Sequence, residues 1–328
     1  MFLYIKAIMK TQKNNFKRPH ISIAPMMAWT DRHCRYFHRL ISPNSAAYTE
    51  MVTTGALRFG DQPRHLDYSN QEHPIALQLG GNDPKDLAFS AKLGEDWGYD
   101  EVNLNCGCPS DRVQNGAFGA CLMNEPDLVA ACVHAMNTAI DIPVTVKCRI
   151  GIDDSEDYAF LNKFIKTVAN AGCETFIIHA RKAWLKGLSP KENREIPPLK
   201  YDVVYRIKQE HPHLNIIING GITTCEETKT HLTHCDGVMI GRETYQNPYI
   251  LADIEATIFG HNSPSRDEVA MQMHEYIQGN DFAPHSVVRH MMGLYKAQKG
   301  GRIWRQTLSD FAHEPDVIKI ALDKMKSA

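Results

Sequence analysis

Eight short apolar segments, separated by helix-like stretches, are the feature that most constrains the fold of this chain. Each is rich in β-branched residues and almost continuously apolar, as strands buried on both faces should be. They occupy residues 21–26, 46–51, 74–79, 100–105, 143–148, 175–179, 214–219 and 236–240. Strands that alternate with helices predict a parallel sheet, and eight such units close a (β/α)8 barrel. We therefore expect an α/β protein built on a TIM barrel.

The helices expected between these strands have recognisable ends. Asp83 and Pro84 are typical of the N-cap and the first position of a helix, which would run to Trp97. Further helices are expected from residue 126, over 155–172 and over 223–231. The alternative architecture is a doubly wound open sheet, which normally carries a G-x-G-x-x-G turn after an early strand, and none stands there.

The last part of the chain has a different pattern. Strand-like segments stop, and apolar residues such as Val269 and Met273 recur at helical spacing. This predicts an all-helical domain over 262–328 that follows a barrel domain over 19–261. The length of 328 residues suits a barrel of about 250 residues with such an appendage. Residues 1–18 are expected to be a disordered extension.

Composition limits the partners of this chain. Its formal net charge is -2, so a nucleic acid would have to bind a local basic patch rather than the global field. The nine cysteines are odd in number and lack C-x-x-C spacing, which argues against both a disulfide framework and a metal site. No apolar run is long enough to span a membrane. We expect a cytoplasmic monomer with no membrane or metal partner.

Polar and glycine residues stand where the predicted strands end. In a barrel, the carboxyl ends of the strands meet at one mouth, where the active site lies. The residues expected to converge there are Pro25, Met26, Met27, Gln78, Asn105, Cys108, Lys147, His179, Asn219, Gly220, Gly221, Gly241 and Arg242.

Two glycine turns follow the seventh and eighth strands, at Gly220-Gly221 and at Gly241-Arg242. Barrels commonly bind a phosphate group at this place through free backbone N–H groups. Either turn alone would be interpreted as a tight turn, but the two together favour phosphate, and Arg242 could add charge-assisted hydrogen bonds.

Two basic groups lie at the ends of the fifth and sixth strands. Lys147 is flanked by apolar residues, and a lysine there is costly unless it meets a negative charge. A reduced, anionic cofactor ring would supply that charge. The alternative is a structural ion pair with a barrel carboxylate such as Glu50. His179 is either a satisfied core histidine or a functional group beside Arg181 and Lys182.

Cys108 lies between Gly107 and Pro109 on a loop that follows the fourth strand. A cysteine held at a fixed angle on an exposed loop can act as a nucleophile or as a general acid. Cys106 is better interpreted as a small buried hydrophobic residue.

Two basic segments suit nucleic acid. The loop over 182–200 carries Lys191 and Arg194, and the segment over 289–305 carries Arg302 and Arg305 with aromatic residues and no acid. Such local clusters are the footprint of phosphate-backbone binding. The alternative for both is a solvated surface.

At this point the motifs resemble the tRNA-dihydrouridine synthases, and the loop sequence SPKENREIPPL resembles the bacterial A-type members. The similarity extends from about residue 20 to the C-terminus. Its motifs are IAPMMAWTDRHCRYFHR (23–39), YTEM (48–51), QLGG (78–81), NLNCGCPSDRVQNGAFGACLM (103–123), VKCRIGID (146–153), HARKAWLKGLSPKENREIPPLKYD (179–202), INGGI (218–222) and DGVMIGRETYQNPYIL (236–251).

The resemblance implies FMN as the cofactor, NADPH as the electron donor and tRNA uridines 20 and 20a as the target. The flavin N5 would deliver hydride to C6 of the uracil and Cys108 a proton to C5, while Lys147 would stabilise the reduced flavin. FMN would contact Pro25, Met26, Met27, Gln78, Lys147, His179, Asn219, Gly220, Gly221, Gly241 and Arg242. The residues that would face tRNA are Asn105, Lys191, Arg194, Arg302 and Arg305.

Two other functions remain open at this stage. One is a flavin-dependent reductase of a small molecule, against which the two basic segments argue because a small substrate needs neither. The other is a tRNA-binding folding factor that retains a flavin, against which Cys108 and Lys147 argue.

Overall fold

Eight parallel strands form the centre of the computed structural model, which describes residues 20–110, 116–155 and 157–328. The predicted extension over 1–18 lies outside these residues. The strands pair in the order β1-β9-β8-β7-β6-β5-β4-β2, with the short β3 as a further pair of β4. Their bounds are β1 (His20–Ile23), β2 (Ala47–Tyr48), β3 (Val52–Thr53), β4 (Ile75–Gly80), β5 (Glu101–Cys106), β6 (Val144–Arg149), β7 (Thr175–His179), β8 (Asn215–Asn219) and β9 (Gly237–Ile240).

The first and last strands of this order meet and close the barrel. Ser22 of β1 forms a parallel bridge with Ala46, just before β2, and the amide of Ile23 donates to the Ala46 carbonyl at 2.9 Å. The predicted TIM-barrel fold is therefore confirmed.

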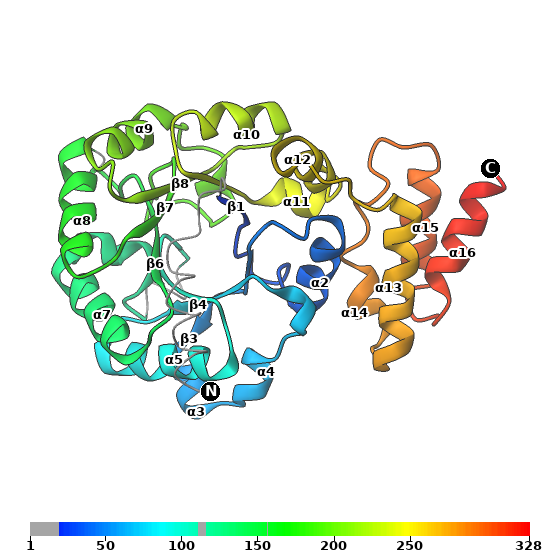
Figure 1. Ribbon diagram of the computed structural model, residues 1–328, viewed down its shortest axis with the longest axis horizontal. Coiled ribbons are helices and arrows are strands. Elements are labelled where there is room, and N and C mark those ends of the chain that lie inside the picture. Colours follow the sequence, from blue (N-terminus) through cyan, green and yellow to red (C-terminus); the bar gives the residue numbers. More distant parts are fainter. Residues whose placement is uncertain (1–19, 111–115, 156) are drawn as a thin grey trace.

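Helices surround the strands, as Figure 1 shows. Those of the barrel are α2 (Arg32–Ile41), α3 (Thr54–Phe59), α4 (Gln62–Leu66), α5 (Pro84–Trp97), α7 (Pro126–Ala139), α8 (Tyr158–Asn170), α9 (Tyr201–Glu210), α10 (Cys225–Leu232), α11 (Arg242–Gln246) and α12 (Ile250–Ile254). Shorter turns are the 3-10 helices η1 (Asn70–Glu72), η2 (Gly119–Asn124) and η3 (Glu192–Arg194), and the π-helix η4 (Glu255–Phe259).

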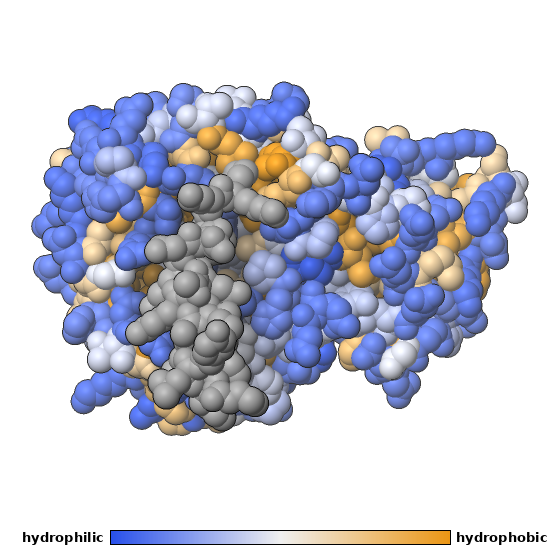
Figure 2. Space-filling model, in the orientation of Figure 1, coloured by the Kyte–Doolittle hydropathy of each residue, from blue (hydrophilic) through white to orange (hydrophobic). Residues whose placement is uncertain are grey.

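Beyond η4 the described residues form helices joined by turns, with no further strand. The elements are α13 (Arg266–Asn280), α14 (Pro284–Val288), α15 (Gly301–Asp310) and α16 (Val317–Lys326). They lie together at one side of the barrel, next to α2 (Figure 1). None of the helices in the described ranges is long and apolar enough to cross a membrane, and Figure 2 shows a largely hydrophilic outer surface.

Some predicted boundaries are wrong for local reasons. The first strand ends at Ile23 rather than at residue 26, because the chain turns where the amides of Trp29 and Thr30 both donate to the Met26 carbonyl. The second strand, predicted over 46–51, breaks after Tyr48 because the amide of Gln78 donates to the Thr49 side chain instead of to a carbonyl.

The start of α8 was also misplaced. The predicted first residue, Ser155, pairs back with Ile152, and Asp157 instead caps the helix by accepting from the amide of Phe160 at 2.6 Å. By contrast, α5 spans the predicted residues 84–97 with Asp83 as its N-cap.

The barrel has two separate apolar clusters. One fills the layer between strands and helices, and the other lies inside the barrel. The inner cluster consists of Ala24, Tyr48, Ala76, Ile177, Ile217 and Met239. In the remaining part of the interior, β5 and β6 carry polar side chains at every second position, because alternate residues of a strand face the same side, and β4 contributes Gln78.

Asp31 connects the C-terminal helices to the barrel. Its Oδ1 caps α2 by accepting from the amides of His33 and Cys34, both at 3.1 Å. Its Oδ2 accepts from Arg289 at 2.6 Å and lies 3.0 Å from the buried Nε2 of His290. Burial alone would raise the pKa of Asp31, but the hydrogen bond to His290 and the other contacts lower it overall.

We expect Asp31→Ala to lower the free energy of unfolding by roughly 2–3 kcal/mol, because it removes a helix cap and the acceptor of two side chains. The matched control is Asp83→Ala. Asp83 caps α5 by accepting from two amides, and its loss should cost about 1 kcal/mol. Urea denaturation of both variants measures the difference. Equal losses would mean that the contacts with the C-terminal helices add nothing.

Candidate active site

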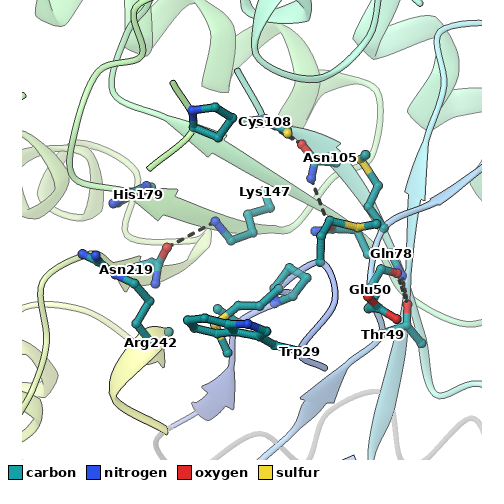
Figure 3. A pocket seen from close by; sticks show the side chains of 18 of the residues that line it. Trp29, Thr49, Glu50, Gln78, Asn105, Cys108, Lys147, His179, Asn219 and Arg242 are labelled. Carbon is teal, nitrogen blue, oxygen red and sulfur yellow. Dashed lines mark hydrogen bonds between the residues drawn. The ribbon is translucent and has the colours of Figure 1, made fainter. Parts of the chain in front are cut away.

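A cavity of about 1310 Å³ opens at the carboxyl ends of the strands. Figure 3 shows side chains from several strands pointing into it. Among the sequence-predicted residues, the lining includes Pro25, Met26, Met27, Gln78, Asn105, Cys108, Lys147, His179, Arg194, Asn219, Gly220, Gly221, Gly241 and Arg242. Lys191, Arg302 and Arg305 are not part of the lining.

The turn after β8 can hold only glycine. Gly220 and Gly221 have φ values of +118° and +73°, a conformation that other residues rarely adopt. A Cβ on Gly220 would stand 2.5 Å from the ring of His179, and one on Gly221 would stand 2.5 Å from Leu199. Both glycines line the cavity, so main-chain atoms without side chains form this part of its wall, which a ligand can approach closely.

The turn after β9 differs from the one after β8. A Cβ on Gly241 would meet nothing closer than 3.8 Å, so packing does not require glycine there. Arg242 donates to Glu195 at 2.6 Å and to the Arg194 carbonyl at 3.4 Å. Its guanidinium is thus already held by the loop over 182–200, and a phosphate would have to share it with Glu195.

Lys147 is a cation without a carboxylate partner among the described residues. Its Nζ donates to Asn219 Oδ1 at 3.2 Å, and the Asn219 amide nitrogen in turn donates to the Met239 carbonyl at 2.8 Å. The alternative ion pair with Glu50 is wrong, because Lys147 binds Asn219 and does not pair with Glu50, whose carboxylate accepts from the amide of Ala28. Burial, with a contribution from Arg149, lowers the pKa of Lys147 to about 8. An anion bound beside it would relieve this penalty.

His179 is neutral at neutral pH. Burial lowers the pKa of its imidazole well below the ordinary value, and the neighbouring cations Arg149 and Lys147 lower it further. In the empty cavity it therefore serves as a neutral hydrogen-bonding group at the wall.

The loop that carries Cys108 is fixed from two sides. Asn105 Oδ1 accepts from the amides of Gly107 and Cys108, both at 3.0 Å. On the other side, Arg149 Nε donates to the Gly107 carbonyl at 2.9 Å. The Cys108 thiol is partly exposed and lies in the cavity wall, whereas Cys106 is fully buried, which raises the pKa of its thiol.

Sequence reasoning missed Arg149, a buried cation that binds main-chain oxygens. In addition to the hydrogen bond from its Nε to the Gly107 carbonyl, its Nη1 donates to the carbonyls of Lys182 and Asn193, both at 3.0 Å. It therefore ties the Cys108 loop to the loop over 182–200. The signal was available, since Arg149 stands two residues after Lys147 and must face the same side of the strand.

The loop over 182–200 is ordered around Asn193. This buried side chain donates to the carbonyls of Trp184 and Leu188 and accepts from the amide of Trp184 at 2.7 Å. Arg194 is brought to the cavity, while Lys191, at the start of η3, is exposed outside it.

The basic segment over 289–305 divides into two groups. Arg289 and Lys296 bind carboxylates of the barrel part, Asp31 and Glu243. Arg302 and Arg305 are exposed on α15, and their spacing of three residues places them on one face of this helix.

No group of three or more metal-ligating side chains was found among the described residues.

Comparison with known proteins gives a consistent result. The family model described as "Dihydrouridine synthase (Dus)" matches residues 22–328. Proteins named tRNA-dihydrouridine(20/20a) synthase are similar over nearly the whole chain. The one from Vibrio cholerae is 58% identical over 317 residues, covering 93% of this chain and 96% of that protein. The one from Salmonella typhimurium is 58% identical over 312 residues, covering 93% of each. The one from Escherichia coli is 59% identical over 300 residues, covering 89% and 90%.

The lowered pKa of Lys147 predicts a pH dependence of stability. Between pH 8 and 10.5 the lysine of the unfolded chain is protonated and that of the folded chain is not, so stability rises with pH in this window. In flavin-free protein we expect the free energy of unfolding of the wild type to rise over this window relative to Lys147→Met, as measured by urea denaturation. The control is Lys85→Met, at an exposed position of α5, which should parallel the wild type. Parallel curves for Lys147→Met would contradict the prediction.

Proposed function

The chain belongs to the dihydrouridine synthase family, and from that premise we propose that it reduces uridines 20 and 20a of tRNA to dihydrouridine, with FMN as cofactor and NADPH as electron donor. The observation that carries this proposal is the convergence of Cys108 and the unpaired cation Lys147 on one cavity. The cavity of about 1310 Å³ exceeds the roughly 300–1,000 Å³ that a single ligand usually fills. It has room for a flavin and a base together.

The residues present fit a flavin phosphate and ring. The bare backbone at Gly220-Gly221 suits the phosphate, and Arg242 stands nearby to share its charge. Lys147 suits an electron-rich ring edge because no described carboxylate compensates it. The remaining residues that we assign to FMN are Pro25, Met26, Met27, Gln78, His179, Asn219 and Gly241. Bound FMN would supply the hydride that reduces C6 of the uracil.

Cys108 is the proton donor in this proposal. The target uridine has to leave the base stack, since its reacting carbons are inaccessible in a stacked base. The partly exposed thiol then delivers its proton to C5, as a general acid. Asn105 and Arg149 hold the loop at a fixed angle for this transfer.

The tRNA contacts are assigned to residues at and beyond the cavity mouth. Arg194 and Asn105 line the cavity and can reach the target nucleotide, and Lys191 is exposed on the same loop as Arg194. Arg302 and Arg305 of the helical domain, assigned to 262–328, suit the phosphate backbone because both are exposed. As an enzyme of tRNA, the protein is proposed to work in the cytoplasm, as a monomer.

The direct test incubates purified protein with FMN, NADPH and unmodified tRNA, and maps dihydrouridine by sequencing. We expect modification at positions 20 and 20a and no turnover of free uridine. No dihydrouridine in tRNA, from protein that holds flavin, would overturn the proposal. Equal turnover of free uridine would favour a small-molecule reductase.

We expect Cys108→Ala to bind FMN and tRNA normally and to lose about 10²–10⁴-fold in the rate of uridine reduction, the usual contribution of a general acid. Single-turnover reduction of tRNA by the NADPH-reduced enzyme measures this loss. Cys106→Ala is the matched control, because it removes a thiol two residues away that is fully buried. Equal losses in the two variants would rule out the assignment of Cys108.

We expect Arg302→Ala/Arg305→Ala to weaken tRNA binding and to flatten its salt dependence by about one unit of slope for each phosphate contact removed. A salt titration of tRNA affinity measures the slope, and FMN content should stay unchanged. The control is Arg206→Ala, an exposed arginine on α9 that pairs with Glu210. Unchanged tRNA affinity in the double variant would assign α15 to a solvated surface.

A further inference from the structure

The polar side of the barrel interior forms one continuous chain of hydrogen bonds. Asn105 Nδ2 donates to Gln78 Oε1 at 2.9 Å, and Gln78 Nε2 donates to Asn103 Oδ1 at 2.8 Å. Asn103 Nδ2 donates to Thr145 Oγ1 at 2.8 Å, and the Thr145 hydroxyl donates to Glu101 Oε1 at 2.5 Å. We call these five residues the amide relay. It runs from the Cys108 loop down to the start of β5.

The direction of the amide relay is set at both of its ends. At the upper end, the amides of Gly107 and Cys108 can only donate, so the oxygen of the Asn105 carboxamide must face them and its nitrogen must face Gln78. At the lower end, the ionised Glu101 carboxylate can only accept, and its Oε1 receives hydrogen bonds from Tyr48 at 2.7 Å and from Thr145. Burial raises the pKa of Glu101 to about 7, so this end is fixed above that pH. The Thr145 hydrogen is thereby used, and its oxygen must accept.

The two ends impose the same direction on the three carboxamides between them. A flip of Gln78 or Asn103 would bring two oxygens or two nitrogens together inside a buried site. Unmatched buried polar groups are costly, so each amide has one permitted orientation. Asn103 and Thr145 are almost completely buried and do not line the cavity, which excludes bulk water as their alternative partner.

This orientation decides what the cavity offers to a ligand. Gln78 and Asn105 line the cavity, whereas Asn103, Thr145 and Glu101 do not. Each carboxamide nitrogen has two hydrogens and donates one of them within the relay. Asn105 Oδ1 already accepts two hydrogen bonds and Gln78 Oε1 accepts one. Two N–H groups therefore remain for a ligand, beside the ammonium of Lys147, against one remaining lone pair on Gln78 Oε1.

We propose that Asn103, Thr145 and Glu101 are positioning residues, which act through the amide relay to present Gln78 and Asn105 as hydrogen-bond donors to the carbonyl oxygens of the rings bound in the cavity. This inference rests on the proposed function, since a flavin and a uracil both carry such carbonyl oxygens. Loss of the relay frees the Gln78 carboxamide to rotate, and its oxygen would then face a carbonyl oxygen of the bound ring.

Thr145→Val tests the relay with little change in shape, because it replaces only the hydroxyl. The control for the loss of a buried hydroxyl is Thr228→Val on α10, whose hydroxyl donates to the Thr224 carbonyl at 3.0 Å, away from the cavity. The rescue variant is Thr145→Ser, which keeps the hydroxyl. The measurements are the FMN dissociation constant of flavin-free protein, the absorption spectrum of bound FMN, and kcat and KM with tRNA.

We expect Thr145→Val to bind FMN about three- to tenfold more weakly, the range that one misaligned hydrogen bond is worth. The flavin spectrum should shift, and kcat should fall while KM for tRNA stays the same. Thr145→Ser should return all three toward the wild type, and Thr228→Val should leave them unchanged. If Thr145→Val does not fold, Asn103→Ala, which removes the acceptor of Gln78, is expected to give the same weakening and spectral shift.

The two levels of the proposal fail in different ways. A wild type that binds FMN but leaves tRNA unmodified overturns the proposed function, while the FMN measurements still test the relay. A wild type that modifies tRNA, with FMN affinity and spectrum the same in Thr145→Val, Thr228→Val and wild type, overturns the relay.

Discussion

Arg149 joins the parts on which the rest of the site depends. It is buried, finds no described carboxylate and donates to three main-chain carbonyls, one on the Cys108 loop and two on the loop over 182–200. Main-chain acceptors keep the full positive charge in place, so Arg149 both fixes the two loops and adds to the positive potential around Lys147. A buried guanidinium without such carbonyl acceptors around it would carry a large desolvation cost. The polar side chains inside the barrel therefore have two roles: they stabilise the buried charge, and they form part of the cavity wall.

The residues that converge at the mouth of the barrel could be predicted, although some strand boundaries could not. Their convergence depends on two simple properties, the number of parallel strands and the alternation of side chains along each. That was enough to bring residues such as Gln78, Lys147 and Asn219 to one cavity. The same alternation extends from Lys147 to Arg149 and Thr145, which the sequence reasoning did not follow. Contacts between distant segments could not be predicted: nothing in the local pattern indicates that Glu195 pairs with Arg242 or that Asp31 pairs with Arg289.

The cations of the basic segment over 289–305 look alike in the sequence but have different surroundings in the structure. Within one acid-free segment, Arg289 and Lys296 pair with carboxylates of the barrel part, whereas Arg302 and Arg305 are exposed on α15. Asp31 caps α2 and binds Arg289 at the same time, so the spacing between the cavity and α15 is tied to the start of a barrel helix. A tRNA that contacts the cavity and α15 at the same time would therefore find a fixed distance between these two contact regions.

The positive charge at the cavity has a consequence for the stability of the protein when the cavity is empty. Lys147, Arg149 and Arg194 face the same space, and the first two have no carboxylate partner among the described residues. Their mutual repulsion weakens the empty fold, and an anionic ligand that binds only the folded state shifts the folding equilibrium by mass action. The resistance of the protein to unfolding would then depend on how much of this ligand is present, and chains without it would be the first to unfold.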